Sequence, residues 1–137
     1  MDGYGKRVLV VDDDMSAGLL MRELLEHEGY NVVVVSNGLN ALCELSKRHF
    51  DVVVTDYVMP LLDGRELLRQ INALYPDTPV ILVSGNLPEH LATELGSQPF
   101  ACIRKPYWND ILIELVRSAV QTPAKIHRDA MPAVAMP

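Results

Sequence analysis

Long hydrophobic runs are absent from this chain. Its uninterrupted apolar stretches span about six residues or fewer, whereas a helix that crosses a bilayer needs about 20. The first residues lead through Lys6 and Arg7 directly into a strand-like segment, which is not the pattern of a signal peptide. The sequence therefore predicts a cytoplasmic protein without a membrane segment.

Cysteine is scarce. The chain has two cysteines, Cys43 and Cys102, and each lies in an apolar segment without a CxxC spacing or a neighbouring histidine. Metal and redox pairs need such neighbours, so the sequence favours two buried free thiols in a reducing compartment.

An excess of positive charge is also missing. The net charge is -6 at pH 7, and lysine and arginine form no cluster along the chain. A nucleic-acid surface would need such a cluster, so the composition predicts protein partners rather than nucleic acid. A chain of 137 residues with 49% hydrophobic residues fits one globular domain with a substantial core.

Short valine-rich runs alternate with segments of helical periodicity. This alternation is typical of βα units and predicts an α/β fold with a mostly parallel sheet. Polar residues do not interrupt the runs, as expected for strands that helices cover on both faces. The predicted strands are residues 7–11, 31–35, 51–55, 79–83 and 100–104.

Apolar residues recur at three- and four-residue spacing after each predicted strand, which predicts five amphipathic helices. Asp14 and Asp63 are predicted helix N-caps. The segment 86–100 is a poor sequence for a regular fourth helix, because Gly96 and Pro99 would end it early.

The helical periodicity stops after residue 121. The segment 122–137 contains three prolines and several alanines, a composition that predicts a flexible tail. We therefore expect one domain over residues 5–121, followed by a tail over residues 122–137.

Chemically reactive side chains lie where the predicted strands end. Three acids, a hydroxyl and an amine hold these positions: Asp12 and Asp13, Asp56, Ser84 and Lys105. Ligands of open α/β sheets bind outside the carboxyl ends of the strands, so these groups are expected to form one site.

The three acids need a cation. Carboxylates about 5 Å apart repel by roughly 3 kcal/mol per pair at an effective dielectric near 20. Carboxylate-rich oxygen ligands suit Mg²⁺, with Mn²⁺ as a substitute, whereas zinc prefers His or Cys. Lys105 would supply a compact cation for a phosphoryl oxygen, and its peptide bond to Pro106 has an appreciable chance of being cis. Ser84 could donate to a phosphate, while Gly85 lets the backbone approach it.

Taken together, these motifs resemble the receiver domain of two-component response regulators. The resemblance covers residues 5–121 and is carried by VLVVDDD at 8–14, VVVTDYVMPLLDG at 52–64, VILVSG at 80–85 and RKPY at 104–107. It implies a flavodoxin-like fold with a five-stranded parallel sheet in the order 2-1-3-4-5 and helices on both faces.

The resemblance also implies a phosphoacceptor. Asp56 would take a phosphoryl group from a phosphohistidine on a sensor kinase or a relay protein, and Lys105 and Ser84 would hold the phosphoryl oxygens. The expected function is a phosphorylation-dependent switch in a two-component phosphorelay rather than a metabolic enzyme. Its output would be a change in protein binding on the face built by the fourth helix, the fifth strand and the fifth helix.

A metal site follows from the same resemblance. Asp13, Asp56 and the carbonyl of Val58 would bind Mg²⁺, and Asp12 would act through a water molecule. With the metal in place, the domain would assist its own phosphorylation.

Three positions in or just after the fifth predicted strand carry further expectations. Cys102 lies where the family usually has an aromatic residue or a histidine that changes rotamer on activation, so we expect it to pack passively. Output would then rely on the loop after Ser84. Tyr107 and Trp108 are expected to begin the last helix and to pack there.

Three other functions are weighed against this one. A Mg²⁺-dependent phosphatase of the haloacid dehalogenase type needs a second Asp two residues after its nucleophile, where this chain has Val58. A flavodoxin-like cofactor binder needs a Ser/Thr/Gly-rich loop after the first strand, where this chain has three acids. A receiver fold that serves only as an interaction module would not need the complete set of acids.

Overall fold

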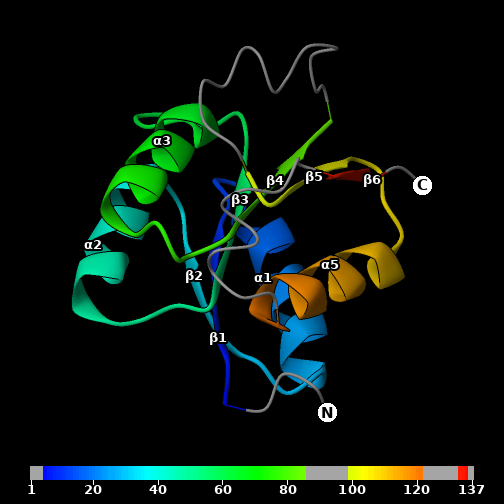
Figure 1. Ribbon diagram of the computed structural model, residues 1–137. Helices are drawn as coiled ribbons and strands as arrows, with labels where there is room; N and C mark the ends of the chain where they lie inside the picture. The colour runs from blue at the N-terminus through cyan, green and yellow to red at the C-terminus, as the bar shows by residue number, and fades with distance from the viewer. Residues whose placement is uncertain (1–4, 86–98, 122–132, 136–137) are drawn as a thin grey trace.

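A parallel sheet of six strands forms the centre of the fold (Figure 1). The computed structural model describes residues 5–85, 99–121 and 133–135. The strand order is β2-β1-β3-β4-β5-β6, so the predicted order of the first five strands is confirmed. The strands are β1 (Arg7–Val11), β2 (Asn31–Val35), β3 (Val52–Asp56), β4 (Val80–Ser84), β5 (Ala101–Arg104) and β6 (Ala133–Ala135).

Helices cover both faces of this sheet (Figure 1). The described helices are α1 (Met15–His27), α2 (Gly38–Lys47), α3 (Gly64–Leu74) and α5 (Asn109–Gln121). One hydrophobic core lies between the sheet and α2 and α3, and a second lies between the sheet and α1 and α5. Among the described ranges, no helix is long and apolar enough to cross a membrane. The prediction of a poor fourth helix falls largely on residues 86–98, outside the described part of the chain.

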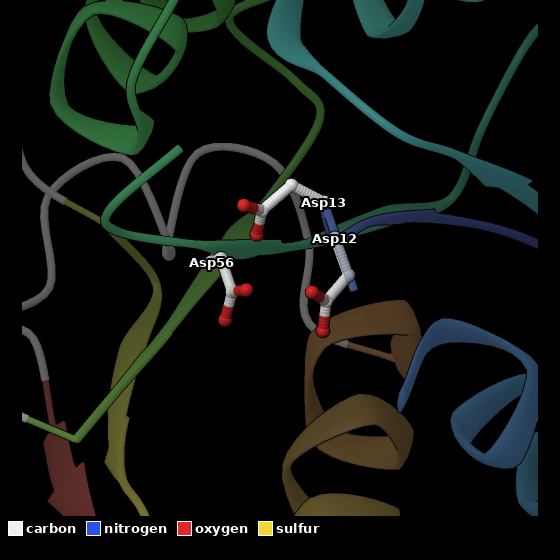
Figure 2. A group of neighbouring side chains, drawn as sticks. All are labelled: Asp12, Asp13 and Asp56. Atoms are coloured by element: carbon white, nitrogen blue, oxygen red, sulfur yellow. The ribbon is translucent and has the colours of Figure 1, made fainter. Parts of the chain in front are cut away.

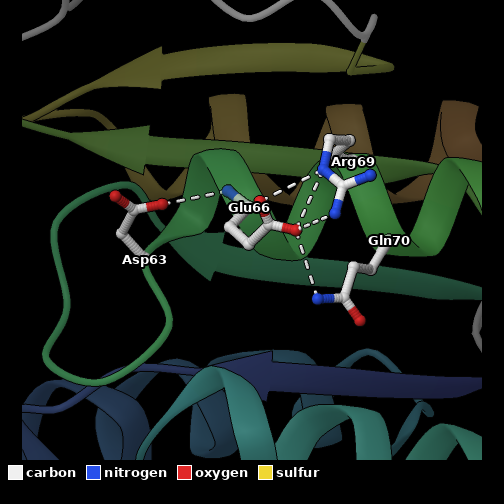
Figure 3. A network of polar contacts seen from close by, with 4 residues as sticks. All are labelled: Asp63, Glu66, Arg69 and Gln70. Atoms are coloured by element: carbon white, nitrogen blue, oxygen red, sulfur yellow. Dashed lines mark hydrogen bonds and ion pairs between the residues drawn. The ribbon is translucent and has the colours of Figure 1, made fainter.

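Side-chain caps fix where the helices begin. Asp14 accepts a hydrogen bond from the backbone N–H of Ser16 at 3.0 Å, and Asp63 accepts one from that of Glu66 at 2.9 Å. Both predicted N-caps are therefore confirmed. Figure 3 shows that the Glu66 carboxylate in turn accepts from Arg69 and Gln70, so the first two turns of α3 form one polar network.

The strands β3 and β4 run one residue later than predicted. The sequence predicted residues 51–55 and 79–83, whereas the strands are residues 52–56 and 80–84. As a result, Asp56 and Ser84 are the last residues of their strands and are held by sheet pairing.

Residues 133–135 lie within the segment 122–137, for which the sequence predicts a flexible tail. They form β6, which pairs parallel with Ala101–Ile103 of β5. Without it, β5 would be the edge of the sheet and would present a row of unpaired backbone groups. Pairing with a remote edge leaves no mark on local composition, which is why the tail was expected to lack structure.

Cys43 and Trp108 are exposed, contrary to expectation. The buried face of α2 is formed by Gly38, Ala41 and Leu45, and helical spacing turns Cys43 away from that face. Trp108 is 66% exposed because α5 begins one residue after it, so Trp108 precedes the apolar stripe of the helix. Cys102 is buried, as predicted.

The start of α3 is pressed against the end of β3. The backbone N–H of Gly64 donates to the carbonyl of Tyr57 at 2.7 Å. A Cβ atom on Gly64 would lie 2.3 Å from the carbonyl oxygen of Asp56 and 2.7 Å from the Cα atom of Tyr57. Those neighbours are backbone atoms of the last residue of β3 and of the residue after it, so they cannot move aside as a flexible side chain would. Only glycine fits at this position.

The substitution Gly64→Ala should destabilise the protein by about 1–3 kcal/mol, the usual cost of forcing an extra carbon into a packed site. Urea unfolding followed by circular dichroism measures the change. Gly85→Ala is the control, because its nearest neighbour to an added Cβ is the Lys105 Cβ atom at 4.0 Å. Equal stability of Gly64→Ala and the wild type would contradict the close approach.

Candidate functional site

Strand register brings the three acids together. Val11 of β1 pairs with Thr55 of β3, so Asp12 and Asp56 follow at the same level of the sheet. Asp13 is the next residue along the chain, and ligand oxygens of the three acids lie within 4.8 Å of one another. Figure 2 shows the carboxylates gathered at the ends of β1 and β3. The predicted clustering of these acids is confirmed.

Asp12 is the most buried of the three acids. The residue is 4% exposed, and its side chain accepts a hydrogen bond from the backbone N–H of Asp14 at 2.9 Å. Burial, together with a side-chain hydrogen bond and like charge from Asp56, raises the pKa of Asp12 to about 6. The ionised form of Asp12 is therefore disfavoured in the folded protein without a bound cation.

Lys105 faces the acids from the other side. Its Nζ atom lies 2.9 Å from Oδ1 of Asp56. Burial opposes the charged form of Lys105, but the hydrogen bond and charge of Asp56 outweigh it, so the pKa of the amine is raised. The backbone N–H of Lys105 donates to the carbonyl of Ser84 at 2.9 Å, which fixes the lysine beside the end of β4. The Lys105–Pro106 peptide bond is cis, the isomer that the sequence had left open.

A pocket opens beside Asp56. Its volume is about 260 Å³, and Ser84 on its wall is 6% exposed, whereas Val58 is 74% exposed. The lining residues are Asp56, Val58, Val83, Ser84, Gly85 and Lys105. The pocket therefore joins the predicted nucleophile, hydroxyl and amine.

Sequence reasoning did not single out Val83 as part of this wall. Val83 was read only as strand core, although it directly precedes Ser84. The continuity of Val83, Ser84 and Gly85 along the chain was the signal that could have found it.

The acids fit a hard divalent cation. Asp12, Asp13 and Asp56 offer three carboxylates from two strand ends, and the described residues hold no other group of acids, histidines or cysteines with such spacing. Mg²⁺ is bound in proteins by one or two carboxylates together with water and phosphate oxygens. The donor set is all oxygen, so it suits Mg²⁺ or Mn²⁺ better than zinc.

The arrangement suits chemistry on a phosphoryl group. A carboxylate that lines the pocket can attack phosphorus, and an amine and a hydroxyl that line it too can bind the phosphoryl oxygens. Acids alone would repel such an anionic substrate, and Lys105 supplies one positive charge beside them.

Comparison with known families points to the same chemistry. Residues 8–117 match the family model described as the response regulator receiver domain. This match covers all of the described strands and helices from α1 to β5 and most of β1 and α5.

Curated relatives are longer proteins. The transcription factor SKN7 of Candida albicans is 33% identical over 128 residues, which are 93% of this chain and 23% of that protein. The C4-dicarboxylate transport transcriptional regulatory protein DctD of Rhizobium meliloti is 34% identical over 113 residues, 82% of this chain and 25% of that protein. The chain thus spans about a quarter of the length of these relatives. Their names are those of transcriptional regulators, so the exclusion of nucleic acid that we drew from composition is not supported.

Solved structures agree with the fold. A response regulator receiver domain protein from Clostridium thermocellum superimposes with a TM-score of 0.76 at 29% identity, over 84% of this chain and 94% of that chain. The response regulator TrrA of Thermotoga maritima, solved in complex with Mg²⁺-BeF, has a TM-score of 0.75 at 29% identity, over 83% and 98% of the two chains.

The raised pKa of Asp12 predicts how stability depends on pH. The unfolded chain loses this proton near 3.8 and the folded chain near 6, so the free energy of unfolding without divalent metal should fall between these values as pH rises. The substitution Asp12→Asn removes the ionisable carboxyl group but keeps a side-chain oxygen that can accept from the backbone N–H of Asp14. The variant should be about 1–3 kcal/mol more stable than the wild type at pH 7 in EDTA, since it removes a buried charge and the repulsion of that charge by Asp56.

Urea unfolding at pH 4, 5, 6 and 7 gives the difference between the two proteins, in which contributions from other acids cancel. A difference that stays constant over this range would contradict the burial and repulsion assigned to Asp12. Added Mg²⁺ should reduce the difference at pH 7.

Proposed function

The chain belongs to the response regulator receiver domain family, and we propose that Asp56 is the residue through which it works as a phosphorylation-dependent switch. The observation that carries this proposal is the position of Asp56. It ends β3 within the acid cluster, lines the pocket, and lies 2.9 Å from the amine of Lys105. No other acid in the described ranges combines these three features.

Asp56 is proposed as the nucleophile. One of its carboxylate oxygens attacks the phosphorus of a phosphohistidine, an O–P bond forms, and the P–N bond breaks with its electron pair returning to the imidazole. Lys105 binds a phosphoryl oxygen as charge develops, and the Ser84 hydroxyl donates to another. Both groups already line the same pocket as Asp56.

Asp12, Asp13, Asp56 and the carbonyl of Val58 are proposed to hold Mg²⁺, or Mn²⁺ in its place, with Asp12 acting through water. The bound cation would neutralise charge on the phosphoryl group and help to orient it. Support comes from the oxygen donor set and from the related TrrA structure, which was solved with Mg²⁺-BeF. The position of Val58 on the pocket wall is consistent with its carbonyl serving as a ligand.

Phosphorylation would change the partner of Lys105. In the described state its amine is bound to Asp56, and an acyl phosphate on Asp56 would offer oxygens that carry more negative charge. Ser84 and the loop that follows would be drawn toward the same oxygens. The phosphoryl group would thus favour one of two arrangements of this edge of the sheet.

Partners and setting complete the proposal. The phosphodonor is a sensor histidine kinase or a histidine phosphotransfer protein, and residues 5–121 form the receiver domain. The output would be a changed protein-binding surface that includes β5 and α5. A cytoplasmic location fits the two free cysteines, Cys43 and Cys102. A phosphatase of the haloacid dehalogenase type is disfavoured, because Val58 holds the position of the second acid it would need.

Asp56→Asn should abolish phosphorylation by a small donor. The purified protein is incubated with Mg²⁺ and acetyl phosphate, and its intact mass is measured. The wild type should gain one phosphoryl group, and Asp56→Asn should gain none because an amide is a far weaker nucleophile than a carboxylate.

Asp63→Asn is the matched control. Asparagine caps a helix about as well as aspartate, so this variant keeps α3 and should be phosphorylated normally. A normal mass gain in Asp56→Asn would refute the assignment of the phosphoacceptor.

Asp13→Asn should weaken Mg²⁺ binding by about tenfold or more, since a contact to a charged ligand is worth about 1.5–3 kcal/mol. Isothermal titration calorimetry of the unphosphorylated protein measures the affinity. Asp14→Asn is the control, because Asp14 is the neighbouring acid but caps α1 and is not one of the clustered acids. Equal affinities in the two variants would remove Asp13 from the metal site.

A further inference from the structure

The sixth strand is an addition to the fold implied by the sequence. β6 extends the sheet beyond β5, with Ala101 paired to Ala133, Cys102 to Val134 and Ile103 to Ala135. Helix α5 lies between the two strands in sequence, so β5, α5 and β6 repeat the βα rhythm of the domain. Eleven residues, 122–132, join α5 to β6 and could span up to about 36 Å, so their length permits the pairing.

Successive residues of a strand direct their backbone N–H and C=O groups to opposite neighbouring strands. This alternation identifies which backbone groups of β5 face β6. The carbonyl of Val83 accepts from the N–H of Tyr57, the residue after β3, so the carbonyls of Leu82 and Ser84 on either side face β5. The Ser84 carbonyl accepts from the N–H of Lys105. Alternation along β5 then turns the N–H of Ile103 toward β4.

The same alternation turns the N–H groups of Cys102 and Arg104 toward β6. In a parallel pair, a residue that faces the neighbouring strand bonds to the residues on either side of its partner. Cys102 is paired with Val134, so its bonding residues are Ala133 and Ala135. The N–H of Val134 faces away from β5.

We propose that the outer edge of β5 is closed by the chain's own residues 133–135, which act as a displaceable strand. The edge would otherwise be a template for strand addition by a partner or by a second copy of the chain. A strand of three residues gains only a few backbone hydrogen bonds against the entropy of ordering it, so it is held weakly. A partner that adds a strand to β5 must therefore displace it.

This strand lies next to the proposed switch. β5 continues directly into Lys105, whose amine is bound to Asp56. The pairing of residues 133–135 with β5 is nevertheless present in the unphosphorylated chain. The inference does not rest on the proposed function, and its failure would leave the role of Asp56 untouched.

Amide hydrogen exchange measured by NMR on the full chain tests the proposal. Ala135→Pro removes an N–H that faces β5, whereas Val134→Pro removes one that faces away and is the matched control. Exchange at Cys102 and Arg104 should become about tenfold faster in Ala135→Pro, the factor expected for the loss of about one backbone hydrogen bond. Val134→Pro should leave these rates within a small factor of the wild type, and Ile103 is the internal reference because it bonds to β4.

A chain that ends at residue 132 provides a second variant, because it lacks only the strand and the two residues after it. Its Cys102 and Arg104 amides should exchange as fast as those of Ala135→Pro or faster, while Ile103 stays protected. Equal exchange at Cys102 in the wild type and the shortened chain would overturn the proposal. Loss of protection when the wild type is diluted would also overturn it, since the strand would then come from a second copy.

Discussion

Holding three carboxylates together is the constraint on which the rest of the structure depends. Their oxygens lie within 4.8 Å, so their mutual repulsion would drive Asp12, Asp13 and Asp56 apart. The parallel register of β1 and β3 keeps them in place, because the two strands pair up to the residues that precede Asp12 and Asp56. Hydrophobic cores on both faces fix those strands. Packing energy from the whole domain thus maintains a charge arrangement that is unfavourable without a ligand.

Lys105 connects this cluster to the ends of β4 and β5. Its amine contacts Asp56 of β3, while its backbone N–H is bound to Ser84 of β4. The ends of β3, β4 and β5 therefore meet at one residue. A ligand that competed for the amine would therefore remove the contact between Lys105 and Asp56, which is the response that the proposed phosphorylation of Asp56 requires.

The sequence was informative where a residue's role depends on its own strand or helix. Short apolar runs placed Asp12, Asp56, Ser84 and Lys105 at one edge because parallel strands end together, and Asp14 and Asp63 were recognisable as caps. Errors arose where the role depends on remote contacts or on small differences in register. Cys43 lies among apolar neighbours, but its exposure depends on which face of α2 meets the sheet. The strand β6 depends on an available edge about 30 residues earlier in the chain, which no local pattern encodes.

The two cysteines of the chain have opposite environments, and this difference has a practical consequence. Cys102 is buried, and burial raises the pKa of its thiol to about 12, so it stays protonated and inaccessible at neutral pH. Cys43 is exposed on α2, in the layer of the fold opposite α5. A maleimide reagent should therefore attach a fluorophore or a spin label to a single position without any engineered cysteine. The native chain therefore carries its own attachment point for spectroscopy, on α2, which packs on the face of the sheet opposite α5.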